Sequence, residues 1–170
     1  MGRSNPPTSQ KYWFDLALFY CSKRETSRSR LKAYFTRKIR EYRVPEENIP
    51  ETLVWIENVL IECERLKIID HERYAGILHR EYQRRGKGKR YITQKFHERG
   101  LEEEVEKLSF DQDEELDRAI ALAMKNKERS TIKKLTDPYQ IRTKLLQKLV
   151  SSGFDLSTAK KAIDVALKSS

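Results

Sequence analysis

Two stretches of the chain, YITQKFHERGL at residues 91–101 and KLLQKLVSSGF at residues 144–154, follow one pattern that decides the fold. Each places an apolar residue, a second apolar residue four later, a glycine after four more, and then a hydrophobe. Apolar residues four apart share a helical face, and glycine most easily adopts the left-handed conformation that ends a helix. Each stretch therefore predicts a helix, a glycine that ends it, and an apolar residue that returns the chain to the core before the next helix. A pattern found twice indicates a tandem repeat, an architecture that usually forms binding surfaces.

The composition favours a helical, basic protein. Charged residues make up 36% of the 170 positions, and the net charge is +9. That charged fraction is well above the ~25% of an average soluble protein. No apolar run approaches the ~20 residues of a membrane span, and the start lacks the apolar core of a signal peptide. Cys21 and Cys63 fall on apolar helical faces, so we expect free, buried thiols in a reducing cytoplasm.

The positive charge is concentrated in three blocks. Residues 22–43 hold nine Lys or Arg against two Glu, while residues 80–99 and 125–148 each hold eight against two acids. An acidic segment at residues 102–117 separates the last two blocks. Three basic blocks along a repeat array indicate a positive stripe directed at a polyanion, either nucleic acid or an acidic protein groove. Solvated helix faces in a highly charged protein are the alternative interpretation.

Helical periodicity organises the whole chain. No stretch alternates with period two for long enough to predict a strand, so the fold class is all-α. We expect nine helices as three tandem three-helix repeats: a flexible lead at residues 1–9, then repeats at 10–69, 70–111 and 112–170, the last containing a polar linker at 127–136. The pattern also predicts helix starts, at which a side chain caps the first turn. The predicted caps are Ser27, Asp70, Asp137 followed by Pro138, and Asp155.

Three segments follow one another in the middle of the chain: LKIIDHERYA at residues 66–75, GKGKRYI at 86–92, and the Ile92/Phe96/Gly100/Leu101 run. In this order they resemble the RecX family, bacterial regulators of the RecA recombinase. The opening at residues 17–31 is similar as well, so the likeness covers about residues 16–166. The chain departs from the family pattern at four positions, where another residue type is usual. These are Arg30 for an acidic residue, His71 for an aspartate, Lys89 for a proline and Arg99 for a lysine.

The resemblance implies a fold and a function. It implies that the three repeats form an elongated, curved array. It also implies binding in the groove of the RecA–DNA filament, with inhibition of RecA ATPase and strand exchange. The cellular setting would be DNA repair by homologous recombination and the SOS response in the bacterial cytoplasm. We expect a monomer that contacts RecA, with a weak direct contact to single- or double-stranded DNA and no membrane.

No arrangement of residues predicts catalysis. The GKGK run at residues 86–89 lacks the spacing of a phosphate-binding loop, and we interpret it as a flexible basic hinge. His79 and His97 lack partners at metal spacing, and we expect both at the surface. Consecutive acids at residues 102–106 favour the positive end of a helix dipole over a nuclease centre. Asp111 precedes a segment without the glycine of a calcium loop, so we interpret it as a helix cap. We therefore expect no enzyme, cofactor or metal.

The candidate contact residues are basic and lie outside the apolar stripes. A second hypothesis is a RecA-independent DNA- or RNA-binding protein whose three-helix units act like helix-turn-helix modules. A third is a scaffold for another acidic partner. The candidates for RecA or DNA contact are Arg24, Arg28 and Lys32 in the first repeat, Arg84, Arg85, Lys87, Lys89 and Arg90 in the second, and Lys144 and Lys148 in the third.

Overall fold

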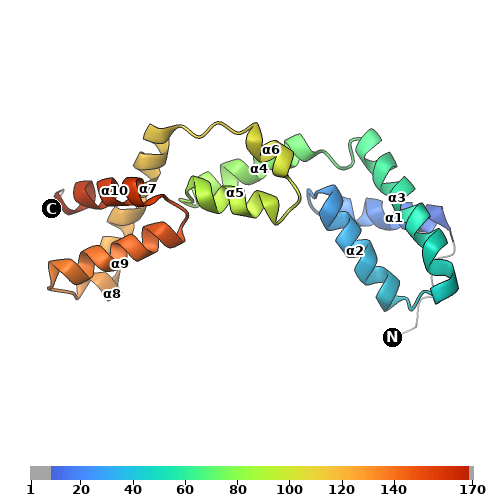
Figure 1. The fold of residues 1–170 in the computed structure, drawn as a ribbon, viewed down its shortest axis with the longest axis horizontal. Helices are drawn as coiled ribbons and strands as arrows, with labels where there is room; N and C mark the ends of the chain where they lie inside the picture. Colours follow the sequence, from blue (N-terminus) through green and yellow to red (C-terminus); the bar gives the residue numbers. More distant parts are fainter. Residues whose placement is uncertain (1–8, 169–170) are drawn as a thin grey trace. The chain divides into compact units, whose positions relative to one another are not determined.

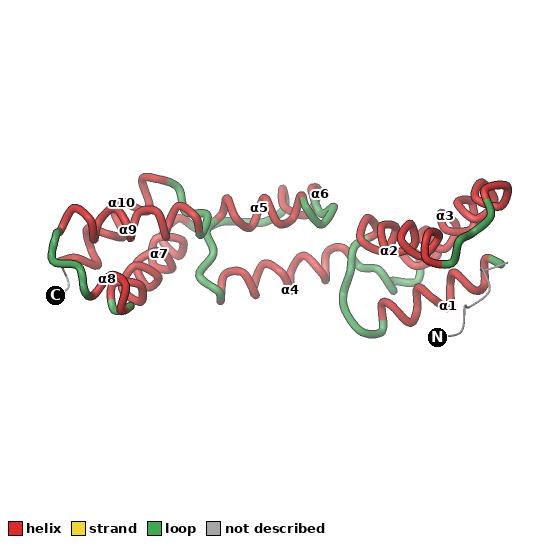
Figure 2. Tube along the Cα trace, turned by 90° about the horizontal axis from the view of Figure 1, so that it is seen from below, coloured by secondary structure: helices red, strands yellow, loops and turns green. Residues whose placement is uncertain are grey.

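The computed structural model describes residues 9–168, and all secondary structure in them is helical (Figure 1). Figure 2 shows helices joined by loops, and no strand occurs within those residues. The chain forms two compact units, one comprising the residues up to Ala75 with Arg99–Leu101, the other Gly76–Glu98 with Glu102 onward. The helices are α1 (Gln10–Cys21), α2 (Arg28–Glu41), the 3₁₀ helix η1 (Glu46–Asn48), α3 (Ile49–Arg65), α4 (His71–Arg84), α5 (Lys89–His97), α6 (Glu102–Glu106), α7 (Gln112–Lys127), α8 (Ser130–Lys133), α9 (Pro138–Ser151) and α10 (Leu156–Lys168).

The predicted helix count is wrong by one among the described residues. The structure has ten α-helices rather than nine, besides η1. The additional helix is α8, inside the segment expected to be a polar linker. It is a single turn whose Ile132 is buried against the core of the second unit. One buried side chain in a polar segment is too weak a periodic signal to predict a helix.

The first unit packs α1 and α2 against α3 around an aromatic core. Trp13, Leu31, Phe35 and Leu60 are fully buried, and the rings of Trp13 and Phe35 meet edge to face at 5.4 Å between centroids. Such a contact adds about 0.5–1.5 kcal/mol to the burial of the rings themselves. Trp13 is therefore part of the core of the first unit.

The second unit has a core of small and branched residues. Ala119 and Ala123 on α7 face Ala159, Ala162 and other buried residues of α10, which is the most extensively packed helix pair of the chain. Alanines allow two helix backbones to approach closely, and larger side chains fill the remaining space. Those larger, fully buried side chains are Leu145 and Leu149 of α9 and Phe154, which lies between α9 and α10.

The predicted helix caps are confirmed. In each case a side-chain oxygen accepts a hydrogen bond from a backbone N–H that the helix leaves without a partner. Asp155, for example, accepts bonds from the N–H and the hydroxyl of Thr158 at 2.8 and 2.9 Å. The same role is filled by Ser27 for Arg30, Asp70 for Arg73, Asp111 for Glu114 and Asp137 for Tyr139.

The helix-ending conformation is not limited to the two predicted glycines, because Arg43, Lys67 and Gly86 also have positive φ after a helix. Gly100 and Gly153 both have positive φ, 66° and 95°, and each is followed by a fully buried hydrophobe. Arg43 also has a positive φ, 52°, and is followed by the buried Val44. Upstream of it stand Phe35 and Ile39, at the spacing of the other two copies. The helix end at Arg43 could not be predicted from the sequence pattern, because arginine occupies the position at which the pattern requires glycine.

Both cysteines are free, as predicted: Cys63 is buried and Cys21 is half-buried. Burial raises the pKa of the Cys63 thiol to about 12 and that of Cys21 to about 11. None of the helices between residues 9 and 168 has the length and hydrophobicity required to cross a membrane.

Candidate functional site

Gly153 and the start of α5 are in direct backbone contact within the second unit. The N–H of Gly88 donates to the carbonyl of Ser152 at 3.0 Å, and the N–H of Arg90 donates to the carbonyl of Gly153 at 3.1 Å. The N–H of Lys89 donates to Glu115 Oε1 on α7 at 2.7 Å. The chain after α9 and a carboxylate of α7 thus satisfy the first N–H groups of α5.

The same kind of joint occurs within the first unit, at the start of α2. The hydroxyls of Ser27 and Ser29 both donate to the carbonyl of Arg99, the latter at 2.9 Å. The N–H of Arg28 donates to Nε2 of His71, the first residue of α4, at 3.1 Å. Each of these two helix starts is therefore bonded to a backbone carbonyl at or next to a left-handed glycine and to a side chain of a further helix of its own unit.

These joints correct the interpretation of residues 86–89 as a flexible hinge. Gly88 is buried, and a Cβ at this position would lie 2.5 Å from the carbonyl oxygen of Gly153. Glycine is needed here for a close approach of two backbones, not for flexibility. The N–H groups that would bind phosphate at a helix N-terminus already donate to Ser152, Gly153 and Glu115.

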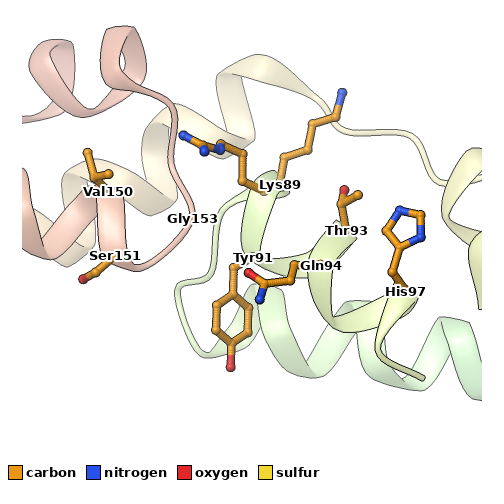
Figure 3. A pocket seen from close by; sticks show the side chains of 9 residues that line it. Lys89, Tyr91, Thr93, Gln94, His97, Val150, Ser151 and Gly153 are labelled. Atoms are coloured by element: carbon orange, nitrogen blue, oxygen red, sulfur yellow. The ribbon is translucent and has the colours of Figure 1, made fainter. Parts of the chain in front are cut away.

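An open groove of about 690 Å³ lies beside this joint (Figure 3). It runs along α5 and is bounded on the other side by the end of α9. Its nine lining residues include three basic side chains and no aspartate or glutamate. They are Lys89, Arg90, Tyr91, Thr93, Gln94, His97, Val150, Ser151 and Gly153.

Tyr91 in this groove is covered by neighbouring side chains. The ammonium of Lys87 lies 4.4 Å from the centroid of its ring, and that of Lys95 lies 5.6 Å away. The ring of Tyr82 packs edge-on against it at 5.5 Å. These cation–π and aromatic contacts hold Lys87 in place and leave the tyrosine ring little open face.

A cluster of cations adjoins the groove. Burial lowers the pKa of Lys87, and the nearby charges of Lys148 and Arg85 lower it further. Lys148 also lines a second hollow together with Lys144 and Arg129. Among the described residues, Lys87, Lys144, Lys148 and Arg129 form no salt bridge, while Arg85 pairs with Glu81 at 3.1 Å. Four of these five cations thus lack a carboxylate partner among the described residues, which makes the surface suited to an anionic partner.

Arg84 and Lys89, two further candidates of the second unit, have other neighbours. Arg84 is exposed and lines a hollow with Arg118 and Lys125 of α7. Lys89 is exposed and places its ammonium 5.3 Å from the ring centroid of Phe110. The structure thus brings Arg85, Lys87 and Lys148 together and places Lys89 with Arg90 at the groove.

The candidate residues of the first unit are more strongly engaged in the fold. Arg28 forms salt bridges with both Glu57 and Glu64, the latter at 2.5 Å. Lys32 pairs with Glu57 at 3.6 Å, and Arg24 lies over the ring of Tyr20. Sequence reasoning could not separate Arg28 and Lys32 from the cations of the second unit, because their carboxylate partners are 25 or more residues away along the chain.

No group of three His, Cys, Asp or Glu side chains within residues 9–168 is arranged to hold a metal ion. His97 is exposed, as expected. The expectation that His79 lies at the surface is wrong: it is half-buried, and its ring packs against Phe110 at 5.4 Å. Burial lowers the pKa of His79, and the charge of Arg118 lowers it further.

The fold and site define an all-helical protein with glycine joints and an open cationic groove. A crystal structure of RecX from Lactobacillus salivarius is similar to it over 94% of this chain and 97% of that one, with a TM-score of 0.69 and 18% identity. A crystal structure of regulatory protein RecX is similar over 91% of this chain and 73% of that one, with a TM-score of 0.69 and 22% identity. The chain therefore has the RecX fold. No family model matches the sequence, and no curated protein matches it.

Proposed function

We propose that the chain is a RecX-type regulatory protein that binds the RecA–single-stranded-DNA filament and mainly inhibits RecA ATPase and strand exchange. The observation that carries this proposal is the RecX fold over more than nine-tenths of the chain. The unpaired cations beside the groove support it, because a nucleoprotein filament presents both phosphates and carboxylates. The protein acts by binding and has no catalytic residues. It works as a monomer in the bacterial cytoplasm, in DNA repair by recombination and the SOS response.

The proposal includes three tandem repeats. Five residues after helices have positive φ: Arg43, Lys67, Gly86, Gly100 and Gly153, which follow α2, α3, α4, α5 and α9. Three of them, Arg43, Gly100 and Gly153, share the spacing of two apolar residues upstream and a buried hydrophobe downstream, one in each proposed repeat. This recurrence supports the proposal of three repeats.

The helix-turn-helix alternative is less compatible with the joints. A recognition helix contacts base edges with its N-terminal residues. In this protein the first turn of α2 is bonded to Arg99, and the first turn of α5 is bonded to Ser152 and Gly153. Neither end is open to a major groove. Direct contact with nucleic acid would instead depend on the exposed lysines and arginines.

A binding comparison tests the proposal against this alternative. The protein is titrated against a preassembled RecA filament and against the same single-stranded DNA alone, at several salt concentrations. We expect the filament to be the tighter ligand. Tight binding of bare DNA at physiological salt, with a steep loss as salt rises, would favour the alternative.

A triple charge reversal tests the surface. Arg85, Lys87 and Arg90 are changed together to glutamate, and a control reverses three other exposed lysines, Lys107, Lys134 and Lys160. We expect the first variant to need at least about tenfold more protein for the same filament binding, while the control binds as the wild type. Unchanged binding by a folded triple variant would eliminate this surface.

A further inference from the structure

The groove between α5 and the end of α9 has the dimensions of a short peptide site. Arg90 and His97 mark its two ends along α5, and seven residues of helix span about 10 Å. An extended chain advances about 3.3 Å per residue, so the groove accommodates about three residues of an extended segment.

Its lining combines one cationic end with a largely neutral remainder. Lys89 and Arg90 lie at one end and His97 at the other, as Figure 3 shows for the labelled side chains of Lys89 and His97. Between them, the amide nitrogen of Gln94 donates to Glu98 at 3.0 Å, which holds the Gln94 side chain along α5. Val150, 39% exposed, supplies an apolar contact on the α9 side.

The aromatic residues distinguish a peptide from single-stranded nucleic acid. Single strands are usually held by stacking of bases on open aromatic faces. Tyr91 is occupied by Lys87, Lys95 and Tyr82, and the other ring in the lining is His97. Successive bases have no stacking platform here, whereas carboxylate side chains require only the cations.

From this arrangement we infer that the groove between α5 and α9 binds an extended acidic peptide segment of a protein partner. The segment places a carboxylate against Arg90 and an apolar side chain against Val150. The inference rests on the proposed function, in which the partner is a protein filament, and assigns the contact at this groove to protein rather than to DNA.

The test uses fluorescence anisotropy with the full chain and defined probes. The first probe is a labelled peptide of alternating glutamate and leucine, the second replaces glutamate with glutamine, and the third is an oligothymidylate of equal charge. We expect the glutamate peptide to bind more tightly than both other probes. Equal or tighter binding of the oligothymidylate would overturn the assignment to peptide.

Two groove variants and a matched control complete the test. Arg90→Glu reverses a cationic end, and Val150→Glu introduces a carboxylate at an exposed position. We expect each to weaken binding of the glutamate peptide by at least about tenfold, and Lys160→Glu on α10 to leave it within about twofold. Circular dichroism verifies that the variants are folded. Wild-type affinity in both groove variants would refute the site.

The inference and the proposed function fail separately. If wild-type protein inhibits RecA and Arg90→Glu inhibits equally while peptide binding is unchanged, the groove site is refuted and the function stands. If the wild type does not inhibit RecA but Arg90→Glu loses the peptide, the groove site stands and the function is refuted.

Discussion

The joint at Gly153 predicts a large loss of stability in Gly153→Ala. A Cβ at this position would lie 2.4 Å from both the Cβ and the backbone N of Tyr91. Ordinary contact begins at 3.4 Å, so α5 and the end of α9 would have to separate by about an ångström. Overpacking of this kind costs about 1–3 kcal/mol. The left-handed φ of 95° adds about 1–2 kcal/mol once a Cβ is present. We expect the free energy of unfolding to fall by roughly 2–5 kcal/mol.

Urea unfolding followed by far-ultraviolet circular dichroism measures this loss. With a slope of roughly 2 kcal/mol per molar urea, the midpoint falls by about 1–2.5 M. Gly76→Ala is the matched control, because Gly76 lies inside α4 and its added Cβ would meet only the flexible end of Arg80 at 3.4 Å. That control should be stabilised by about 0.5–1 kcal/mol. A wild-type midpoint for Gly153→Ala would refute the close approach of the two backbones.

Three further predictions use the same unfolding assay or thiol labelling. Arg43→Gly removes the strain of a left-handed backbone that carries a Cβ, and it introduces no new atoms. It should raise the free energy of unfolding by up to about 1 kcal/mol. A loss of stability would contradict the account of this helix end. Asp155→Ala removes the cap of α10 and should cost about 0.5–2 kcal/mol at neutral pH. The hydrogen bonds from Thr158 and Ser157 lower the pKa of Asp155 to about 2, so the stabilisation is complete above the ordinary pKa of 3.8 and is lost as pH falls toward 2. A difference between variant and wild type that persisted at the lowest pH would exclude the charged cap. Cys63, whose thiol pKa burial raises to about 12, should react with iodoacetamide far more slowly in the native protein than in urea; equal rates would show that it is not buried.

Local features of the fold could be predicted from the sequence because each has a local cause. Asp137 before Pro138 and Asp155 before Leu156 specify helix starts by their own side chains. Gly153 specifies a helix end by its backbone freedom. The equivalent end at Arg43 could not be found in this way. Its left-handed conformation is favoured by burial of the following Val44, which the identity of Arg43 does not reveal.

The candidate site depends on contacts between distant residues, which the sequence does not display. The charge blocks identified Arg28 and Lys87 equally well. Only the structure shows that Arg28 is neutralised by Glu57 and Glu64, whereas Lys87 faces Lys148. The close approach of Gly88 to Gly153 joins positions 65 residues apart and likewise has no local signature.

The central claim is tested most directly by the single-stranded-DNA-dependent ATPase of the cognate RecA, titrated with this protein. The account predicts inhibition, and inhibition at substoichiometric protein would indicate action at filament ends or on filament growth. An unchanged ATPase rate with a stoichiometric excess of folded protein would contradict it and remove RecA as the target.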